Sequence, residues 1–402
     1  MSSLKGTKSG KSILWISFFQ ARGLDNASLL NILMQLAKLG HPVSLITVKS
    51  TRTNTFENKG LKTVLFPLKR IPLLLPLVFA FLLYFYLPLF ILTSNIDIVI
   101  LEPSVHILGV FPSLLISKFT KTKFVLDIRS TPVETANLGG RLLKLWFSIS
   151  VLIAKKFFDG FTIITPLMGK SVSRDFNLGN KKIGIWTSGV SQVLFNPEKY
   201  ADDSLKLRKK LDLEKRFIVF YHGIFTATRG LQETIKAMAV VKQKKPNIIL
   251  LLLGTGPIVN ILNELVREEG LQQNVMICDP VEQIEVPKFI LMCDVSIIPL
   301  PANHYWRFQS PLKLLEYLAM EKVVILTDMP AHRAVVGNSE CGIYLSSIKP
   351  TEIAEAIEFA YANKSNLVEW GKNGGRIVGR EYTWEKVAGD LEDFLNNLYD
   401  SN

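Results

Sequence analysis

The sequence predicts an α/β fold made of two doubly wound, Rossmann-like domains that face each other across a cleft. Short apolar, β-rich runs alternate with helical patterns from Ser12 onward, as expected for parallel sheets covered by helices on both faces. The same alternation begins again after a polar stretch from Pro197 to Arg216. In addition, 402 residues are enough for two domains that each bury a core.

The predicted elements follow one another in both halves. The first half reads as ILWIS, a helix over Ala27–Leu39, VSLITV, an apolar helix, DIVIL, a helix over Val105–Phe119, KFVLDI, a helix over Leu142–Phe158, FTIIT and KIGIW. The second half reads as FIVFY, a helix over Leu231–Lys242, IILLLLG, a helix over Ile258–Glu269, VMIC, a helix over Val286–Met292, DVSIIP, a helix over Leu312–Ala319 and VVILT. We therefore expect an N-terminal domain over residues 1–195 and a C-terminal domain over 196–383, with a last helix within 384–402 that packs back on the first domain.

The cysteines and histidines give no sign of a metal site or a disulfide framework. Cys278, Cys293 and Cys341 each lie in or beside an apolar run, which favours buried thiols in a reducing compartment. The five histidines are scattered, and no pair of candidate ligands has metal-ligand spacing. We expect neither a metal nor another cofactor.

One apolar segment is long enough to span a bilayer. Ile71 to Leu92 holds 22 uncharged residues, preceded by Lys69 and Arg70. Three prolines interrupt it, and the strand-like DIVIL follows within a few residues. A helix that dips into one leaflet, a buried packing helix and a true span therefore all stay open. The N-terminus lacks the pattern of a signal peptide, so we expect a cytoplasmic protein, peripheral or monotopic on the inner face of the cell membrane.

The positive charge is confined to the first half of the chain. Residues 1–200 hold 24 Lys and Arg against 9 Asp and Glu, whereas residues 201–402 hold 23 against 26. A solvated surface, anionic lipid and nucleic acid are the three interpretations of this charge. We do not expect nucleic acid as the partner, because the basic half lacks the aromatic-rich strands of stacking platforms.

Glycines and cations follow the strands of the second half, at the edge of a parallel sheet where ligands collect. FIVFY leads to His222-Gly223 and then Arg229-Gly230, and IILLLLG leads to Gly254 and Gly256. A third such junction begins the helix at Leu312, with Ser310 as the expected N-cap and Pro311 at the first helical position. Together, they provide what a diphosphate requires.

Lys313 is unfavourably placed in that helix, because a cation in the first turn faces the positive end of the helix dipole. A bound anion would relieve this position; the alternative is a lysine that extends into water. Glu316 lies on the same helix face and cannot contact the same anion, so we expect it to face a hydroxylated part of the ligand such as a ribose.

Several motifs occur in a family-specific order and spacing. The longest is SPLKLLEYLAM from Ser310 to Met320, followed by VVI, TDMPAH and Cys341-Gly342. Shorter ones are SGV, FNP, Arg229-Gly230, GTGP and DVSIIP. With these motifs, the sequence resembles the family-4 retaining glycosyltransferases of the GT-B fold, the glycosyltransferase group 1 type, over nearly its whole length.

The resemblance implies a metal-independent, retaining hexosyltransferase that uses a nucleotide-sugar donor. Arg229 and Lys313 would bind the diphosphate, Glu316 the ribose, and the Ser310–Leu312 amides the phosphate. Further residues implied on the donor side are Gly23, His222, Gly223, Gly254 and Gly256, and those on the acceptor or sugar side are Asp127 and Arg129. We expect a lipid-linked glycan or glycolipid acceptor at an anionic membrane surface, in the synthesis of cell-surface polysaccharide or glycan.

Departures from the family pattern leave two alternatives open. Phe308 occupies the position of the family's first glutamate, near the sugar hydroxyls, and Arg129 stands where many relatives have a histidine. A catalytically inactive, membrane-associated partner subunit of a glycosyltransferase is one alternative. A sugar-nucleotide epimerase of the GT-B fold is the other.

Overall fold

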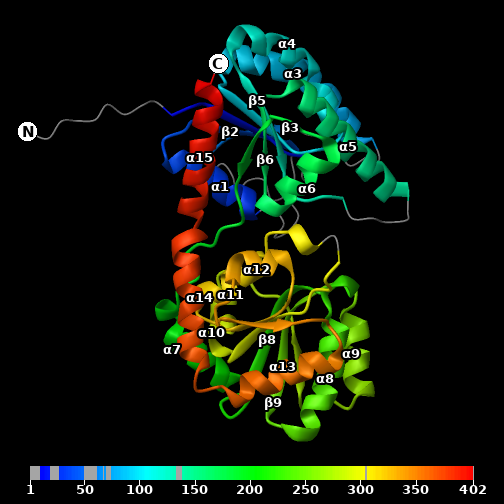
Figure 1. The fold of residues 1–402 in the computed structure, drawn as a ribbon, viewed down its shortest axis with the longest axis vertical. Coiled ribbons are helices and arrows are strands. Elements are labelled where there is room, and N and C mark those ends of the chain that lie inside the picture. Colours follow the sequence, from blue (N-terminus) through cyan, green and yellow to red (C-terminus); the bar gives the residue numbers. More distant parts are fainter. Residues whose placement is uncertain are drawn as a thin grey trace, which may run out of the picture. The chain divides into compact units, whose positions relative to one another are not determined.

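The computed structural model describes residues 10–18, 27–48, 61–66, 68, 74–132, 138–303 and 306–401. The chain forms two compact units (Figure 1), the first over residues 1–188 and 384–402 and the second over 189–383. The predicted boundary is residue 195, whereas the first unit ends at residue 188. The observed boundary lies earlier because Val190 forms a parallel bridge with Thr383, which ties this stretch to the second unit.

The first unit is built on a seven-stranded parallel sheet with the order β3-β2-β1-β4-β5-β6-β7. The strands are β1 (Ile13–Ile16), β2 (Val43–Val48), β3 (Lys62–Phe66), β4 (Ile98–Leu101), β5 (Lys123–Ile128), β6 (Gly160–Ile163) and β7 (Lys182–Ile185). The central strands are apolar runs buried on both faces, as in other parallel sheets.

Helices cover both faces of this sheet (Figure 1). On one face, α1 (Ala27–Lys38) and the C-terminal α15 (Trp384–Asp400) share an apolar core with Trp15 of β1 and Val125 of β5. The remaining helices of the unit are α3 (Leu75–Ser94), the 3₁₀ helix η2 (Val105–Val110), α4 (Phe111–Thr120), α5 (Leu138–Phe157) and α6 (Pro166–Phe176). The single helix predicted over Val105–Phe119 is therefore two, since Pro112 lies in the first turn of α4 and favours a helix start there.

The second unit has a six-stranded parallel sheet with the order β10-β9-β8-β11-β12-β13. Its strands are β8 (Phe217–Ile224), β9 (Ile248–Thr255), β10 (Val275–Cys278), β11 (Val295–Ile298), β12 (Val324–Thr327) and β13 (Gly342–Leu345). Its helices are α7 (Pro197–Lys210), η3 (Ala227–Arg229), α8 (Leu231–Lys244), α9 (Val259–Glu268), α10 (Val286–Met292), η4 (Trp306–Phe308), α11 (Leu312–Ala319), α12 (Pro330–Val336), α13 (Pro350–Ala362) and α14 (Leu367–Glu381).

The predicted polar connection from Pro197 to Arg216 is largely the helix α7. Asn196 caps it, because its side-chain oxygen accepts a hydrogen bond of 3.0 Å from the backbone N–H of Glu198. Pro197 occupies the first turn and three basic residues the last, which complements the helix dipole. These local signals outweigh the low hydrophobicity of the segment.

Candidate functional site

The first part of the site is formed by two loops at the carboxyl edge of the second unit's sheet. Gly223 and Gly254 are paired across β8 and β9, and their φ angles are 123° and 147°. A Cβ atom on Gly254 would lie 2.0 Å from the Gly223 carbonyl oxygen, and one on Gly256 would lie 2.2 Å from that of Phe225. The glycines are therefore required because the backbones of the two loops touch.

Lys313 crosses the first of these loops instead of extending into water. A Cβ atom on Gly223 would lie 2.5 Å from the Lys313 Cε and 2.9 Å from its Nζ. The ammonium also lies 5.4 Å from the centre of the Tyr221 ring. Burial lowers the pKa of Lys313 to about 8, and the nearby Arg229 cation acts in the same direction. Lys313 is thus a cation held where its charge is unfavourable.

Arg229 lies at the end of η3, directly before Gly230. A Cβ atom on Gly230 would be 1.9 Å from the carbonyl oxygen of Pro299, so only glycine permits this approach at its φ of 67°. The guanidinium carbon of Arg229 lies 4.5 Å from the centre of the Trp306 ring. Sequence reasoning missed Trp306, whose position four residues before Ser310 gave no periodic or motif signal.

Within the described part of the chain, the Glu316 carboxylate favours the charged form of Lys313, but burial and Arg229 outweigh it. Among the residues that the structure describes, Lys313 and Arg229 form no ion pair, and two buried donors, Arg229 Nε and Gln309 Nε2, have no hydrogen-bond partner. Buried donors in proteins are normally paired. The cluster therefore has the charge and the open hydrogen-bonding capacity to take up an anion.

Glu316 belongs to a separate hydrogen-bond network beside these cations. Its side chain is buried, and its Oε2 lies 3.0 Å from His222 Nε2. The other ring nitrogen of His222 lies 3.0 Å from the Tyr317 hydroxyl oxygen, which also accepts a hydrogen bond from the His222 backbone N–H. Adjacent helix residues thus fix both sides of the imidazole and hold the carboxylate in one place.

The start of α11 differs from the prediction in two respects. Pro311, rather than Ser310, is the cap residue, and no side chain caps this helix. The amides of Ser310–Leu312, predicted to bind phosphate, also do not offer three donors. Pro311 has no N–H, and the N–H of Leu312 donates a hydrogen bond of 3.1 Å to the Ser310 carbonyl.

The residues assigned to the acceptor side lie in the first unit. Asp127 is buried near the end of β5, where its Oδ1 accepts hydrogen bonds from Thr162 Oγ1 at 2.7 Å and Trp186 Nε1 at 2.8 Å. The guanidinium of Arg129 stacks on the Trp186 ring, 3.4 Å from its centre, and donates a hydrogen bond of 2.6 Å to the Trp186 carbonyl. Gly23 lies outside the described residues.

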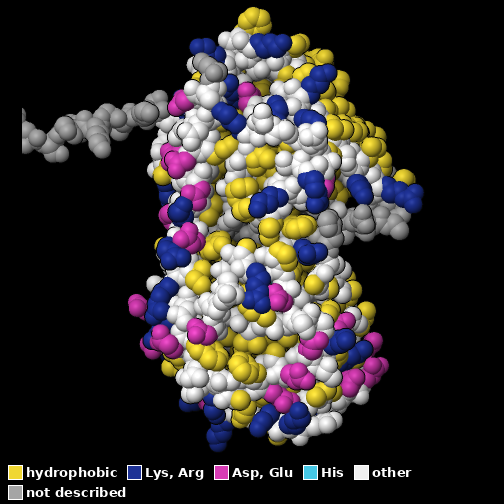
Figure 2. Space-filling model, viewed as in Figure 1, with side chains coloured by type: hydrophobic (Ala, Val, Ile, Leu, Met, Phe, Trp, Pro, Cys, Tyr) yellow, Lys and Arg dark blue, Asp and Glu magenta, His cyan; other side chains and the backbone are white. Residues whose placement is uncertain are grey.

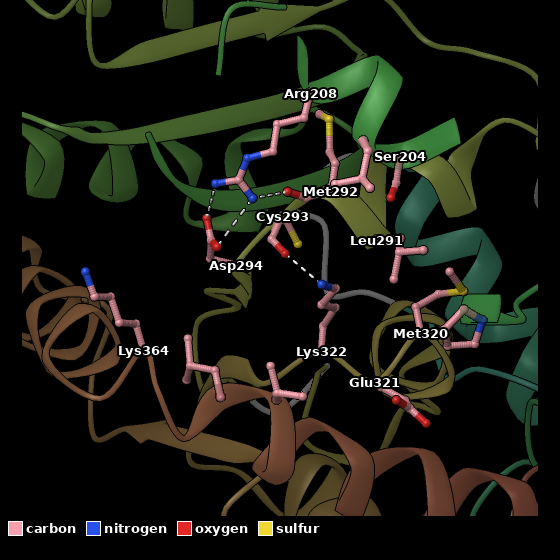
Figure 3. Close-up of a pocket in the computed structure, with 14 residues that line it drawn as sticks. Ser204, Arg208, Leu291, Met292, Cys293, Asp294, Met320, Glu321, Lys322 and Lys364 are labelled. Atoms are coloured by element: carbon pink, nitrogen blue, oxygen red, sulfur yellow. Dashed lines mark hydrogen bonds and ion pairs between the residues drawn. The ribbon is translucent and has the colours of Figure 1, made fainter. Parts of the chain in front are cut away.

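A cavity of about 320 Å³ elsewhere in the second unit contains none of the predicted site residues (Figure 3). It lies where Asp294 and Lys322 precede their strands, opposite to the carboxyl edge. Its polar groups are largely paired with each other: Arg208 contacts Asp294 at 3.1 Å, and Lys322 donates to the Cys293 carbonyl at 2.8 Å. Within the described ranges, no three His, Cys, Asp or Glu side chains are grouped for a metal ion.

Comparisons with known proteins relate the second unit to one family of enzymes. Residues 203–376 match the model of the family described as Glycosyl transferases group 1. An uncharacterized glycosyltransferase of Methanocaldococcus jannaschii is 28% identical over 305 residues, covering 72% of this chain and 66% of its own. A GDP-mannose-dependent alpha-(1-6)-phosphatidylinositol monomannoside mannosyltransferase of Mycobacterium tuberculosis is 22% identical, covering 52% and 54%. The chain thus spans about two thirds of the first relative and half of the second.

A solved structure supports the fold. The Anabaena protein HepE, determined in complex with UDP, has a TM-score of 0.76 at 14% identity, and the match covers 96% of this chain and 100% of HepE. Both parallel-sheet units take part in a match of this extent. Residues 203–376 of this chain are therefore similar to the group 1 glycosyl transferases, and the chain as a whole has the GT-B fold.

Proposed function

We propose that this protein transfers a hexose from a nucleotide-sugar to an acceptor, with retention of anomeric configuration. The acceptor is a lipid-linked glycan or glycolipid at the cytoplasmic face of a membrane. The observation that carries the proposal is the pair of neighbouring cations, Lys313 and Arg229, together with the buried Arg229 Nε, which has no hydrogen-bond partner among the described residues.

The two cations suit the leaving group of such a reaction. Negative charge builds on the diphosphate as the glycosidic bond loosens, and fixed cations stabilise it without reorganisation. Since Lys313 and Arg229 would supply this charge, the reaction needs no metal ion. No carboxylate is placed as a nucleophile in the predicted motifs, so the departing phosphate oxygen takes the acceptor proton on the same face of the sugar.

Glu316 would bind the nucleotide ribose. A carboxylate accepts hydrogen bonds from vicinal hydroxyls, and His222 fixes its Oε2 in one orientation. This arrangement costs little reorganisation on binding, because His222 is itself held by Tyr317. His222 therefore acts through Glu316, as a positioning residue.

The membrane part of the proposal rests on an apolar face of the first unit. Helix α3 is long and apolar enough to cross a membrane, and part of it is buried. Its exposed residues include Phe81, Phe85 and Leu89, which are 64%, 58% and 63% exposed and lie one turn apart. Its opposite side, including Leu83, is buried in the unit. This two-sided pattern favours a helix that lies on the unit and contacts one leaflet.

Neighbouring helices extend this face. Helix α4 packs on α3, and its Phe111 contacts Phe157 of α5. Figure 2 shows hydrophobic side chains with Lys and Arg among them over this region of the first unit. Exposed apolar residues on α4 and α5 are Phe111, Leu115, Phe119, Leu138, Leu142, Leu143, Leu145, Leu152 and Phe157. Exposed apolar area of this extent next to basic residues fits an anionic membrane surface.

The test begins with the donor. The purified protein is soaked with mixed nucleotide-sugars and the bound species is identified by mass spectrometry; the Lys313→Ala and Arg229→Ala variants are compared with Lys364→Ala. Lys364 lines the separate cavity and serves as the matched control. We expect wild type and control to retain a nucleotide-sugar and both site variants to lose it. Retention by all four proteins would contradict the assignment.

Two other functions make different predictions. An inactive partner subunit, which Phe308 in place of the family's glutamate allows, would bind the nucleotide-sugar without transferring the sugar to any lipid acceptor. An epimerase would produce epimerised sugar from the donor alone. Incubation with and without a membrane lipid extract, followed by analysis of both sugar and lipid, separates the three.

A further inference from the structure

A row of polar side chains crosses the sheet of the first unit at its carboxyl edge. The register pairs Ile16 of β1 with Leu101 of β4, and Leu101 with Leu126 of β5. One residue further along, Ser17 and Glu102 directly follow β1 and β4 and lie beside Asp127 of β5. Asp127 is in turn paired with Thr162 of β6. Residues in one row of a parallel sheet point to the same face, so these four side chains form one cluster.

The cluster contains a buried carboxylate with unused hydrogen-bonding capacity. Asp127 is 1% exposed, and its Oδ1 is occupied by Thr162 and Trp186. Its Oδ2 is buried, and within the described part of the chain it has no partner. An unpaired carboxylate oxygen costs free energy unless a ligand or a water molecule reaches it. Asp127 Oδ2 is therefore a buried hydrogen-bond acceptor that a ligand or a water molecule can use.

Glu102 and Arg129 form the accessible side of the cluster. Both are only partly buried, whereas Ser17 and Asp127 are fully enclosed. Burial, followed by the neighbouring Asp127 carboxyl, raises the pKa of Glu102 to about 7. The Arg129 guanidinium is fixed above the Trp186 ring, and the Asp127 and Glu102 carboxyl groups both lie close enough to act on its charge. A ligand that reaches the row would therefore meet Glu102 and Arg129 first.

We propose that Glu102, beside Arg129 and Asp127, is a further binding residue that accepts hydrogen bonds from hydroxyl groups of the acceptor carbohydrate. This inference rests on the proposed function and adds Glu102, which no motif indicated. Carboxylates accept hydrogen bonds from hydroxyls, and a guanidinium donates to their oxygens, so the cluster complements a neutral polyhydroxylated ligand. Two carboxylates beside one arginine disfavour an anion, and the arginine disfavours a metal ion.

The test uses binding, so that it does not depend on turnover. A panel of methyl glycosides of glucose, galactose, mannose and N-acetylglucosamine is offered to the full chain and followed by saturation-transfer difference NMR. Glu102→Gln and Arg129→Met are compared with Asp175→Asn, which changes an exposed carboxylate of the same unit. Circular dichroism and thermal melting check that each variant is folded.

We expect at least one glycoside to bind the wild type and the Asp175→Asn control, and its signal to fall at least fivefold in both cluster variants. Binding should be several-fold stronger at pH 8 than at pH 6, because the ionised Glu102 is the better acceptor. Glu102→Gln should flatten this pH dependence. Ser17, Asp127, Arg129 and His106 face Glu102; burial lowers the pKa of His106 to about 4, which keeps it neutral throughout this range.

Two results would overturn the proposal: no glycoside binds a wild type that does bind nucleotide, or the cluster variants bind glycosides as the wild type does. Mn²⁺ broadening that is lost in Glu102→Gln would assign the cluster to a cation instead. UDP and GDP titrations on the same samples test nucleotide binding separately from glycoside binding, so the transferase function and the carbohydrate site are tested independently. Glycoside binding without nucleotide binding would refute the transferase function and leave this site standing.

Discussion

Nucleotide binding should be linked to a proton on Lys313. Burial and Arg229 lower the pKa of this lysine to about 8 in the free protein. A bound diphosphate places negative charge beside the ammonium, which favours the charged form and raises its pKa again. Binding above neutral pH must therefore take up a proton from solution, and Lys313→Ala must abolish that uptake.

The size of the effect follows from the free-state pKa. If the anion restores the pKa to its ordinary value near 10.5, linkage gives an uptake of about 0.5 proton per nucleotide at pH 8, about 0.9 at pH 9 and close to zero at pH 6. Affinity should then fall by roughly tenfold per pH unit above pH 8, because the lysine is neutral before binding. The terminal phosphate of the nucleotide has a pKa of about 6, so it contributes little to proton uptake above pH 8.

Isothermal titration of UDP or GDP in buffers of different ionisation enthalpy measures this uptake directly. The Lys364→Ala variant is the control, since Lys364 lines the separate cavity and should leave the uptake unchanged. Tight nucleotide binding without proton uptake at pH 8 to 9 would refute the placement of the diphosphate next to Lys313. Any residual nucleotide binding by Lys313→Ala should occur without this uptake, and uptake that accompanies residual binding would refute the placement as well.

Further outcomes follow from the same structure. Arg229→Ala and Lys313→Ala should each lower turnover by about two orders of magnitude or more in a radiolabel transfer assay. Each change removes a positive charge that would stabilise the negatively charged leaving group. Near-normal rates would contradict this. Glu316→Gln should weaken nucleotide affinity in titration, and unchanged affinity would count against the ribose contact. EDTA should leave transfer intact, and a large loss would show a metal requirement. Lys313→Met should stabilise the ligand-free protein by about 1 to 3 kcal/mol at pH 7, because the buried charged lysine destabilises the folded state. This destabilisation should decrease as the pH rises from about 8, the pKa of Lys313 in the folded protein, toward 10.5, its ordinary value. An unchanged melting temperature would argue against a buried ammonium. Replacing the exposed Phe81, Phe85 and Leu89 with serine should reduce co-sedimentation with anionic liposomes without unfolding the protein. In contrast, Leu83→Ser should lower the melting temperature, because Leu83 is buried. Unchanged liposome binding by the triple variant would show that α3 does not contact the membrane.

The architecture of both units could be predicted from the order of residue types along the chain. Uninterrupted apolar runs such as IILLLLG are typical of strands buried on both faces, and their alternation with helical patterns requires parallel sheets. The glycines and cations that follow these runs must then meet at one sheet edge, which is why Arg229 and Lys313 could be selected without coordinates. The helix α7 was not predicted, because its low hydrophobicity resembles that of a connecting segment.

The interactions between these residues could not be predicted, because they depend on how distant segments pack. The lowered pKa of Lys313 depends on the approach of α11 to the β8 loop, and the contact between His222 and Glu316 joins positions 94 residues apart. The side of α3 that packs on the unit was equally hidden, because its residues are apolar all round and give no helical periodicity. Glu102 and Asp127 become neighbours because β4 and β5 pair in one register, and a shift by one residue would place their side chains on opposite faces.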